Sequence, residues 1–231
     1  MKKTTFLWVI FAIFLSELIM VMNQVNGFII YAVLLGIVLV SIEKGKYLNE
    51  NYVLLIFLMI VPTARISELF IPFGFIVKSF IFYAVIASLA VFYTRKFHIN
   101  SVKTLLDEWI YGVGIVLIGF LLALDAKFFL DMQNALLIPL ILFIAYTEEI
   151  LFRGKIQNLT KEKYGAFYSI FFTSLLYGIF SISYGFPFFL IAFFACLILC
   201  TIYQFTKNIH LSFLMNISFH IIFFIVYPSL F

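Results

Sequence analysis

Hydrophobic residues occur in long runs along the chain, and short polar stretches separate these runs. A helix that spans a bilayer needs about 20 mostly apolar residues, and most of the runs approach that length. The pattern therefore predicts an all-α protein, a polytopic bundle of about eight or nine transmembrane helices. The predicted segments are 4–22, 28–42, 51–63, 74–94, 109–125, 134–152, 165–184, 187–206 and 209–229.

One segment and one loop interrupt this regular pattern. Segment 51–63 is short and ends near Pro62, which predicts a tilted, half-inserted or re-entrant piece, because proline removes a backbone donor. The polar loop 95–108 is either an ordinary connection or a short amphipathic helix on the membrane surface. It divides the chain into N-terminal membrane helices, 1–108, and a C-terminal membrane core, 109–231.

The composition excludes a soluble domain. Hydrophobic residues make up 65% of the 231 residues and charged residues 11%, and phenylalanine alone occurs 32 times. If nine segments alternate from a cytoplasmic N-terminus, Arg65, Lys78 and Lys127 fall outside the cytoplasmic side, which leaves twelve of the 15 lysines and arginines on it. We therefore predict a multi-pass cell-membrane protein with a cytoplasmic N-terminus, a retained first helix, the lipid bilayer as its environment and no nucleic-acid partner.

Several polar residues inside the apolar runs have structural explanations. Cys196 and Cys200 lie four residues apart on one segment, where a disulfide is unfavourable, so we expect buried, inert thiols. Ser181 is expected to donate a hydrogen bond back to a helical carbonyl. Glu17, inside the first segment, is expected to pair with a polar group on another helix.

A cluster of charges interrupts segment 134–152 at Glu148 and Glu149, with Arg153 four residues further on. A charged side chain at bilayer depth costs ~2.5–3.5 kcal/mol, so such clusters usually line a cavity or a site. On an α-helix Glu149 and Arg153 would lie on one face and pair, whereas Glu148 would be rotated by ~100°. If the helix ends at Phe152, the cluster is an interfacial salt bridge. If it continues to 156–159, which we favour, the carboxylates lie near mid-membrane and one of them could act as a base or metal ligand.

Three motifs within 134–228 carry a resemblance to a known family. They are Glu148-Glu149-x-x-x-Arg153-Gly154 followed by Gln157 and Leu159, then Thr173 to Ser181 around Tyr177, then Asn208 to His220 around Asn216. This arrangement resembles the CPBP family, which comprises type II CAAX prenyl endopeptidases and bacteriocin-processing or immunity (Abi) membrane proteins. The resemblance implies a membrane-embedded hydrolase whose glutamates and histidines activate water or hold a metal ion.

Both histidine positions of that pattern are altered in this chain. Ser181 stands where the second motif places histidine, and Asn216 and His220 exchange the histidine and asparagine of the third motif. The residues that the resemblance makes catalytic are Glu148, Glu149, Arg153, Asn216 and His220. A divalent metal ion, zinc in the first place, would be held by Glu149 and His220 with help from Glu148. In a metal-free site a glutamate would be the base, and Asn216 with His220 would stabilise the oxyanion.

Three functions remain open on this basis. The first is an intramembrane endopeptidase, metallo- or glutamate-type, that hydrolyses a peptide bond of a membrane-embedded or lipidated protein, with Arg153 positioning the carboxylate. The second is a catalytically inactive homologue that acts in bacteriocin self-immunity or as a membrane scaffold or regulator. The third is a small transporter with a carboxylate proton site, which explains the charges but not the motif spacing.

Overall fold

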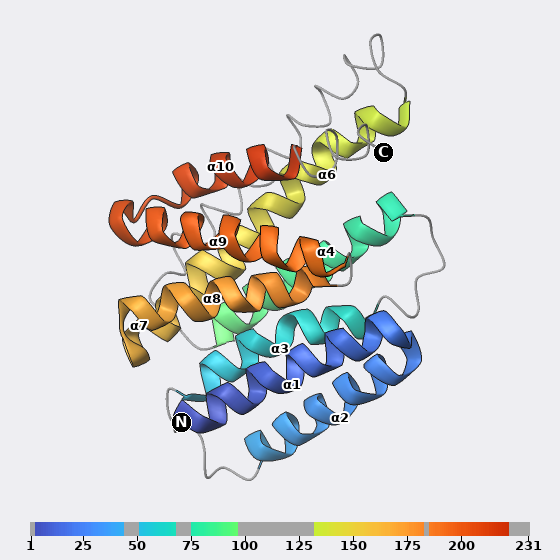
Figure 1. The fold of residues 1–231 in the computed structure, drawn as a ribbon, viewed down its shortest axis with the longest axis vertical. Helices are drawn as coiled ribbons and strands as arrows, with labels where there is room; N and C mark the ends of the chain where they lie inside the picture. Colours follow the sequence, from blue (N-terminus) through green and yellow to red (C-terminus); the bar gives the residue numbers. More distant parts are fainter. Residues whose placement is uncertain (1–2, 44–50, 68–74, 97–131, 183–184, 222–231) are drawn as a thin grey trace. The chain divides into compact units, whose positions relative to one another are not determined.

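The part of the chain that the structure describes is entirely helical. A computed structural model describes residues 3–43, 51–67, 75–96, 132–182 and 185–221 (Figure 1). The helices are α1 (Lys3–Met22), α2 (Gln24–Glu43), α3 (Asn51–Ser67), α4 (Phe75–Lys96), α6 (Met132–Glu148), η2 (Glu149–Gln157), α7 (Asn158–Tyr164), α8 (Ala166–Ser181), α9 (Phe186–Thr206) and α10 (Ile209–Ile221). The predicted all-α class is confirmed over these ranges. The predicted segment 109–125 and most of the loop 95–108 lie outside the described residues, so the number of spans stays a prediction.

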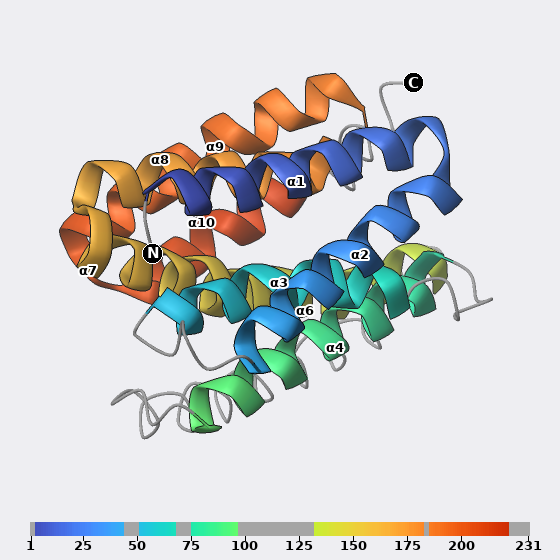
Figure 2. The same ribbon diagram turned by 90° about the horizontal axis from the view of Figure 1, so that it is seen from below.

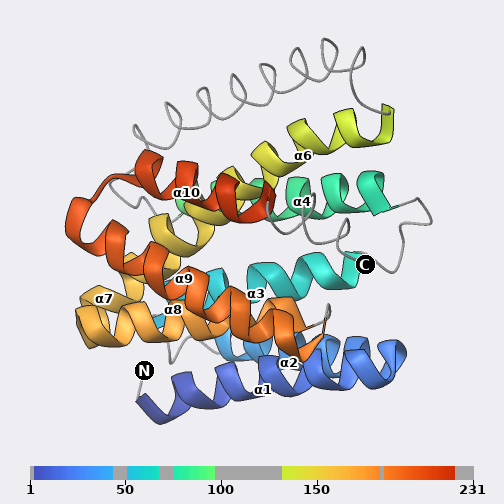
Figure 3. The same ribbon diagram turned by 45° about the horizontal axis from the view of Figure 1, so that its top comes forward.

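The helices form two compact units, and each unit draws on distant parts of the sequence. The first comprises Met1–Phe70 and Phe152–Lys207, and the second comprises Ile71–Leu151 and Asn208–Phe231. In the first unit α8 lies against α9 and α7, while α1 packs on α2 in a hairpin (Figure 2). In the second unit α6 packs against both α4 and α10 (Figure 3). The division of the sequence at residue 108 stays a prediction.

Two asparagines begin helices by capping their first backbone N–H groups. Asn23 Oδ1 accepts a hydrogen bond from the Asn26 backbone N at 3.1 Å, at the start of α2. Asn208 Oδ1 accepts from the backbone N of His210 and Leu211, at 2.9 and 3.2 Å, at the start of α10. The second cap matters for the site, because it sets where α10 begins and therefore which of its residues face α6.

Positive backbone φ angles mark the boundaries of α8 and α9. Gly165 (φ 91°) separates α7 from α8, and Gly185 (φ 114°) precedes α9. Glycine adopts these angles at little steric cost, because it has no Cβ. Pro187 follows in the first turn of α9, where a missing N–H breaks no helical bond.

Two helices continue through a proline. Helix α3 includes Pro62 and runs on to Ser67, and α6 includes Pro139. The expectation that segment 51–63 ends near Pro62 is therefore wrong. The residues around Pro62 are buried, so apolar packing holds the helix together across the lost backbone bond. The Thr63 hydroxyl also donates back to the Met59 carbonyl at 2.8 Å, one helical turn away.

Apolar surface on the described helices is consistent with a lipid environment. Among the described residues, helix α9 is long and apolar enough by itself to cross a membrane, and α1, α2, α3, α4 and α8 contain apolar stretches of 10–17 residues. Helix α2 carries a stripe of Ile29, Val33, Ile37 and Val40, each between 50% and 59% exposed. A continuous exposed apolar stripe is unusual in contact with water and is typical of contact with lipid or a partner.

A buried ion pair connects four helices of the first unit. Glu17 Oε1 accepts hydrogen bonds from the Tyr31 hydroxyl at 2.7 Å and from Arg65 Nε at 3.3 Å. Arg65 Nη2 also donates to the Phe180 carbonyl at 3.0 Å, in the last turn of α8. The expected pairing of Glu17 with another helix is confirmed, and the arginine stabilises the carbonyl end of α8 as well.

Candidate active site

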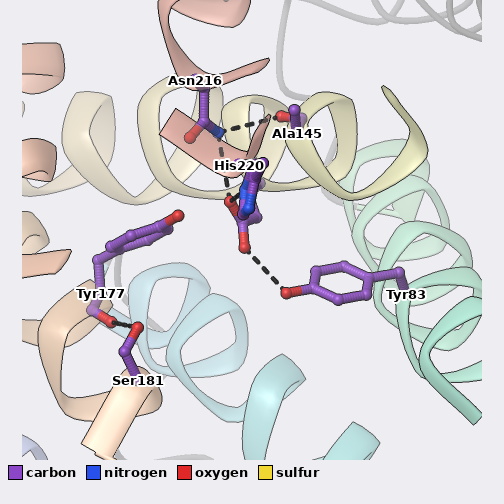
Figure 4. A network of polar contacts seen from close by, with 7 residues as sticks. Tyr83, Ala145, Tyr177, Ser181, Asn216 and His220 are labelled. Atoms are coloured by element: carbon purple, nitrogen blue, oxygen red, sulfur yellow. Dashed lines mark hydrogen bonds and ion pairs between the residues drawn. The ribbon is translucent and has the colours of Figure 1, made fainter. Parts of the chain in front are cut away.

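The carboxylate of Glu148, the last residue of α6, accepts hydrogen bonds from two other helices (Figure 4). His220 Nε2 lies 2.8 Å from Oε2, and Asn216 Nδ2 donates to the same oxygen at 3.2 Å. Both side chains come from α10. The Tyr83 hydroxyl, from α4, donates to Oε1 at 2.9 Å. All three helices belong to the second unit, and Glu148 is only 7% exposed.

Asn216 and His220 meet Glu148 because four residues separate them on α10. That spacing brings side chains to the same face of an α-helix. Both residues are buried. The convergence of these two residues with Glu148 is what the family resemblance led us to expect.

An apolar cluster holds α6 against α10 next to these polar contacts. It consists of Ala145, Tyr146, Ile150 and Phe213, with Ile217 packed against it. The rings of Tyr146 and Phe213 meet edge to face, with their centroids 5.8 Å apart. This packing fixes the distance between the two helices and hence the geometry around Glu148.

The helix that carries the first motif continues beyond Phe152, as expected, but it changes type at Glu149. Residues Glu149–Gln157 form a π-helix, in which backbone bonds run from i to i+5 rather than i+4. The argument that α-helical spacing places Glu149 and Arg153 on one face therefore does not hold in this segment. Asn216 Nδ2 also reaches the Ala145 carbonyl, four residues before the π-helix begins, at 3.4 Å. π-Helical turns are rare in proteins, and many of those that do occur lie at functional sites.

Arg153 and Gln157, further along the first motif, make contacts within the first unit. Arg153 is fully buried, and its Cζ lies 5.3 Å from the centroid of the Tyr177 ring, a cation–π contact with the second motif. Gln157 Nε2 donates to the Cys200 carbonyl at 2.8 Å. These residues therefore join helices of the first unit, whereas Glu148 belongs to the polar cluster of the second. Glu149, the first residue of the π-helix, is 1% exposed.

The second motif contributes no imidazole. The Ser181 hydroxyl donates to the Tyr177 carbonyl at 3.2 Å, one helical turn back, which confirms the expected bond (Figure 4). Cys196 and Cys200 are buried free thiols, as predicted, with their sulfur atoms 3.6 Å apart.

The donors around Glu148 contact its carboxylate directly. Among the described side chains, no three His, Cys, Asp or Glu side chains form a group that could hold a metal ion. Zinc would be bound at about 2.0–2.2 Å from a nitrogen and from an oxygen ligand, with the ion between the two. Glu148 and His220 instead lie at direct hydrogen-bonding distance from each other. The divalent metal ion expected at Glu149 and His220 stays a prediction.

Tyr83 is the site residue that the sequence did not indicate. It is one of 13 tyrosines and lies in an apolar segment far from the three motifs. No local pattern distinguishes it, because its importance comes from the packing of α4 against α6.

The fold and the site together define an all-α protein with a buried carboxylate that is held by an imidazole, an amide and a phenol. The family described as Type II CAAX prenyl endopeptidase Rce1-like matches residues 131–223. This range contains all three motifs, and the match confirms the family resemblance for this part of the chain. It supports a membrane location and an intramembrane endopeptidase kind of function. No curated protein and no solved structure shows a significant match to the chain.

Proposed function

We propose that the protein is an intramembrane endopeptidase that hydrolyses a peptide bond of a prenylated, membrane-associated protein, with Glu148 as the water-activating base. The observation that carries this proposal is the convergence of Asn216 and His220 on the Glu148 carboxylate. Prenylation adds an isoprenoid chain to the cysteine of a C-terminal C-a-a-X sequence, and the family name points to substrates of this type.

Glu148 is the candidate base, because its carboxylate is oriented by donors from two helices. In the proposed reaction a water molecule gives a proton to Glu148 while its oxygen bonds to the carbonyl carbon of the substrate. Asn216 holds the carboxylate, and His220, beside it, would polarise the substrate carbonyl. The carbon–nitrogen bond then breaks, and the proton passes from Glu148 to the leaving amine. Arg153 and Glu149 remain candidates for positioning this helix.

The test is cleavage of a fluorogenic peptide with a farnesylated C-a-a-X end by the full-length protein in liposomes. Glu148→Gln keeps the size of the side chain, but its amide cannot take the proton, so we expect cleavage to fall by about 10²-fold or more. Glu162→Gln is the matched control, because Glu162 is exposed on α7. We expect this variant to cleave the peptide at the wild-type rate. The same peptide without the farnesyl group tests the substrate class. Cleavage by Glu148→Gln at the wild-type rate would contradict the proposal.

A second candidate is the inactive homologue in bacteriocin self-immunity or membrane scaffolding. The observation in its favour is Ser181, whose hydroxyl bonds to its own helix where the family pattern has an imidazole. This alternative expects no cleavage by the wild type and an immunity phenotype that survives Glu148→Gln.

A further inference from the structure

Tyr83 contacts the proposed base from a helix outside the family match. The matched range is 131–223, and Tyr83 lies on α4, which ends at Lys96. Its hydroxyl donates to Glu148 Oε1 at 2.9 Å across 65 residues of sequence. In Figure 4 the phenol ring extends from α4 toward the carboxylate, with its hydroxyl at the tip.

Aromatic packing between α4 and α6 holds the phenol in place. Phe80, three residues before Tyr83 and therefore on the same side of α4, stacks on Phe143 of α6 with centroids 4.8 Å apart and planes 18° apart. The ring of Phe82 meets the Tyr83 ring edge to face at 5.1 Å. A phenol has two side-chain torsions, so these contacts leave its hydroxyl little freedom.

The two oxygens of Glu148 have different surroundings. Oε2 lies against two groups of α10, the Asn216 amide and the His220 imidazole. The Tyr83 hydroxyl of α4 donates to the other oxygen, Oε1. Both oxygens of the carboxylate are therefore contacted, one from α10 and one from α4.

We propose that Tyr83 is a positioning residue of the hydrolytic site, whose hydroxyl orients the Glu148 carboxylate to take the proton of the attacking water. This inference rests on the proposed function. In the step, an O–H bond of water breaks, its proton moves to the Glu148 carboxylate, and the water oxygen bonds to the substrate carbonyl carbon. Tyr83 neither gains nor loses a proton overall. Its hydrogen bond fixes the orientation of the Glu148 carboxylate for the proton transfer from water.

The test compares Tyr83→Phe with Tyr93→Phe on the full-length protein in liposomes. Both substitutions remove one hydroxyl from α4 and keep the ring. With the farnesylated peptide, we expect Tyr83→Phe to lower kcat about tenfold or more with little change in KM, because the hydroxyl acts on the base and not on substrate binding. Tyr93→Phe should leave both constants unchanged. A wild-type kcat in Tyr83→Phe, or an equal rise in KM, overturns the inference.

An infrared measurement makes the result independent of the substrate. The Glu148 carboxylate band is identified as the band lost in Glu148→Gln, and we expect Tyr83→Phe to shift it and Tyr93→Phe to leave it in place. A band that does not move in Tyr83→Phe overturns the inference, whatever the peptide shows. If Glu148→Gln cleaves normally, the proposed function fails first. If only Glu148→Gln is inactive and Tyr83→Phe is normal, the proposed function stands and the role of Tyr83 does not.

Discussion

Glu148 Oε2 and His220 Nε2 lie 2.8 Å apart although 72 residues separate them in the sequence. This contact joins the first motif to the third and is made by an imidazole in the place where the family pattern has an amide. Because the exchanged residues are four apart on α10, both orders present one imidazole and one amide to the same face. The exchange therefore changes which group stands closer to Oε2 and keeps the chemistry of that face.

Restoring the family order should accordingly be tolerated. We expect Asn216→His combined with His220→Asn to cleave the farnesylated peptide faster than His220→Asn alone, because the double variant again has an imidazole beside Glu148. The effects of substituting two residues that contact a common partner are expected to be non-additive. The measurement is kcat/KM for the two single variants and the double variant. A double variant no faster than His220→Asn would show that the imidazole is needed at position 220 itself.

Metal removal should leave activity unchanged. The donors around Glu148 engage each other directly, and no group of three metal-ligating side chains occurs in the described ranges. We therefore expect the protein to cleave the farnesylated peptide at an unchanged rate after dialysis against EDTA and 1,10-phenanthroline. Metal analysis of the dialysed protein checks that metal has been removed. Loss of activity that added zinc restores would contradict the metal-free mechanism.

The Glu17–Arg65 ion pair should be needed as a pair for stability. Its side chains are 0% and 10% exposed, so removal of one partner leaves a buried charge without its counter-charge. Arg65→Met is expected to lower the free energy of unfolding by about 3–5 kcal/mol. Glu17→Gln in the same chain removes the charge and keeps an acceptor for Tyr31, so the double variant should recover most of that loss.

Denaturant unfolding in detergent micelles gives the free energy of unfolding of the wild type, of Arg65→Met and of the double variant. A double variant as unstable as Arg65→Met would mean that the guanidinium matters through its bond to the Phe180 carbonyl rather than through the charge of Glu17.

The sequence was most informative where a local rule applies. Long apolar runs predicted the helices, and the four-residue spacing placed Asn216 and His220 on one helix face. The hydrogen bond of the Ser181 hydroxyl to a carbonyl of its own helix was predicted because serine commonly makes this bond in helices. The convergence of α10 on Glu148 came from the family resemblance, because no local pattern relates residues so far apart in the chain.

The features that the sequence did not predict depend on packing between distant segments. Residues Glu149–Gln157 are as compatible with an α-helix as with the π-helix that forms, so the change of helix type has no local signal. Proline predicts the end of a helix, but the buried residues around Pro62 keep α3 continuous to Ser67. Tyr83 becomes a site residue only because α4 packs on α6, and each compact unit combines segments that are distant in the sequence.

Two glycines of α2 offer a test of the packing in the first unit. A Cβ on Gly27 would lie 2.5 Å from Met20 Cβ and 2.7 Å from Met20 Cα, whereas a Cβ on Gly36 would meet nothing within 4 Å. Gly27→Ala must therefore push the α1 backbone away, and we expect it to lower the free energy of unfolding by about 1–3 kcal/mol. Gly36→Ala should be neutral or stabilising by about 0.5–1 kcal/mol, because alanine favours the helix more than glycine does.

Thermal unfolding of both variants in detergent, followed by circular dichroism, separates the two effects. The substitutions are chemically identical and lie on the same helix, so any difference between them comes from the contact with α1. Equal unfolding midpoints would mean that α1 and α2 do not approach each other closely at Gly27. A midpoint lowered only in Gly27→Ala would establish that glycine is required there to let the two helices pack, since helix propensity alone would raise the stability of both variants.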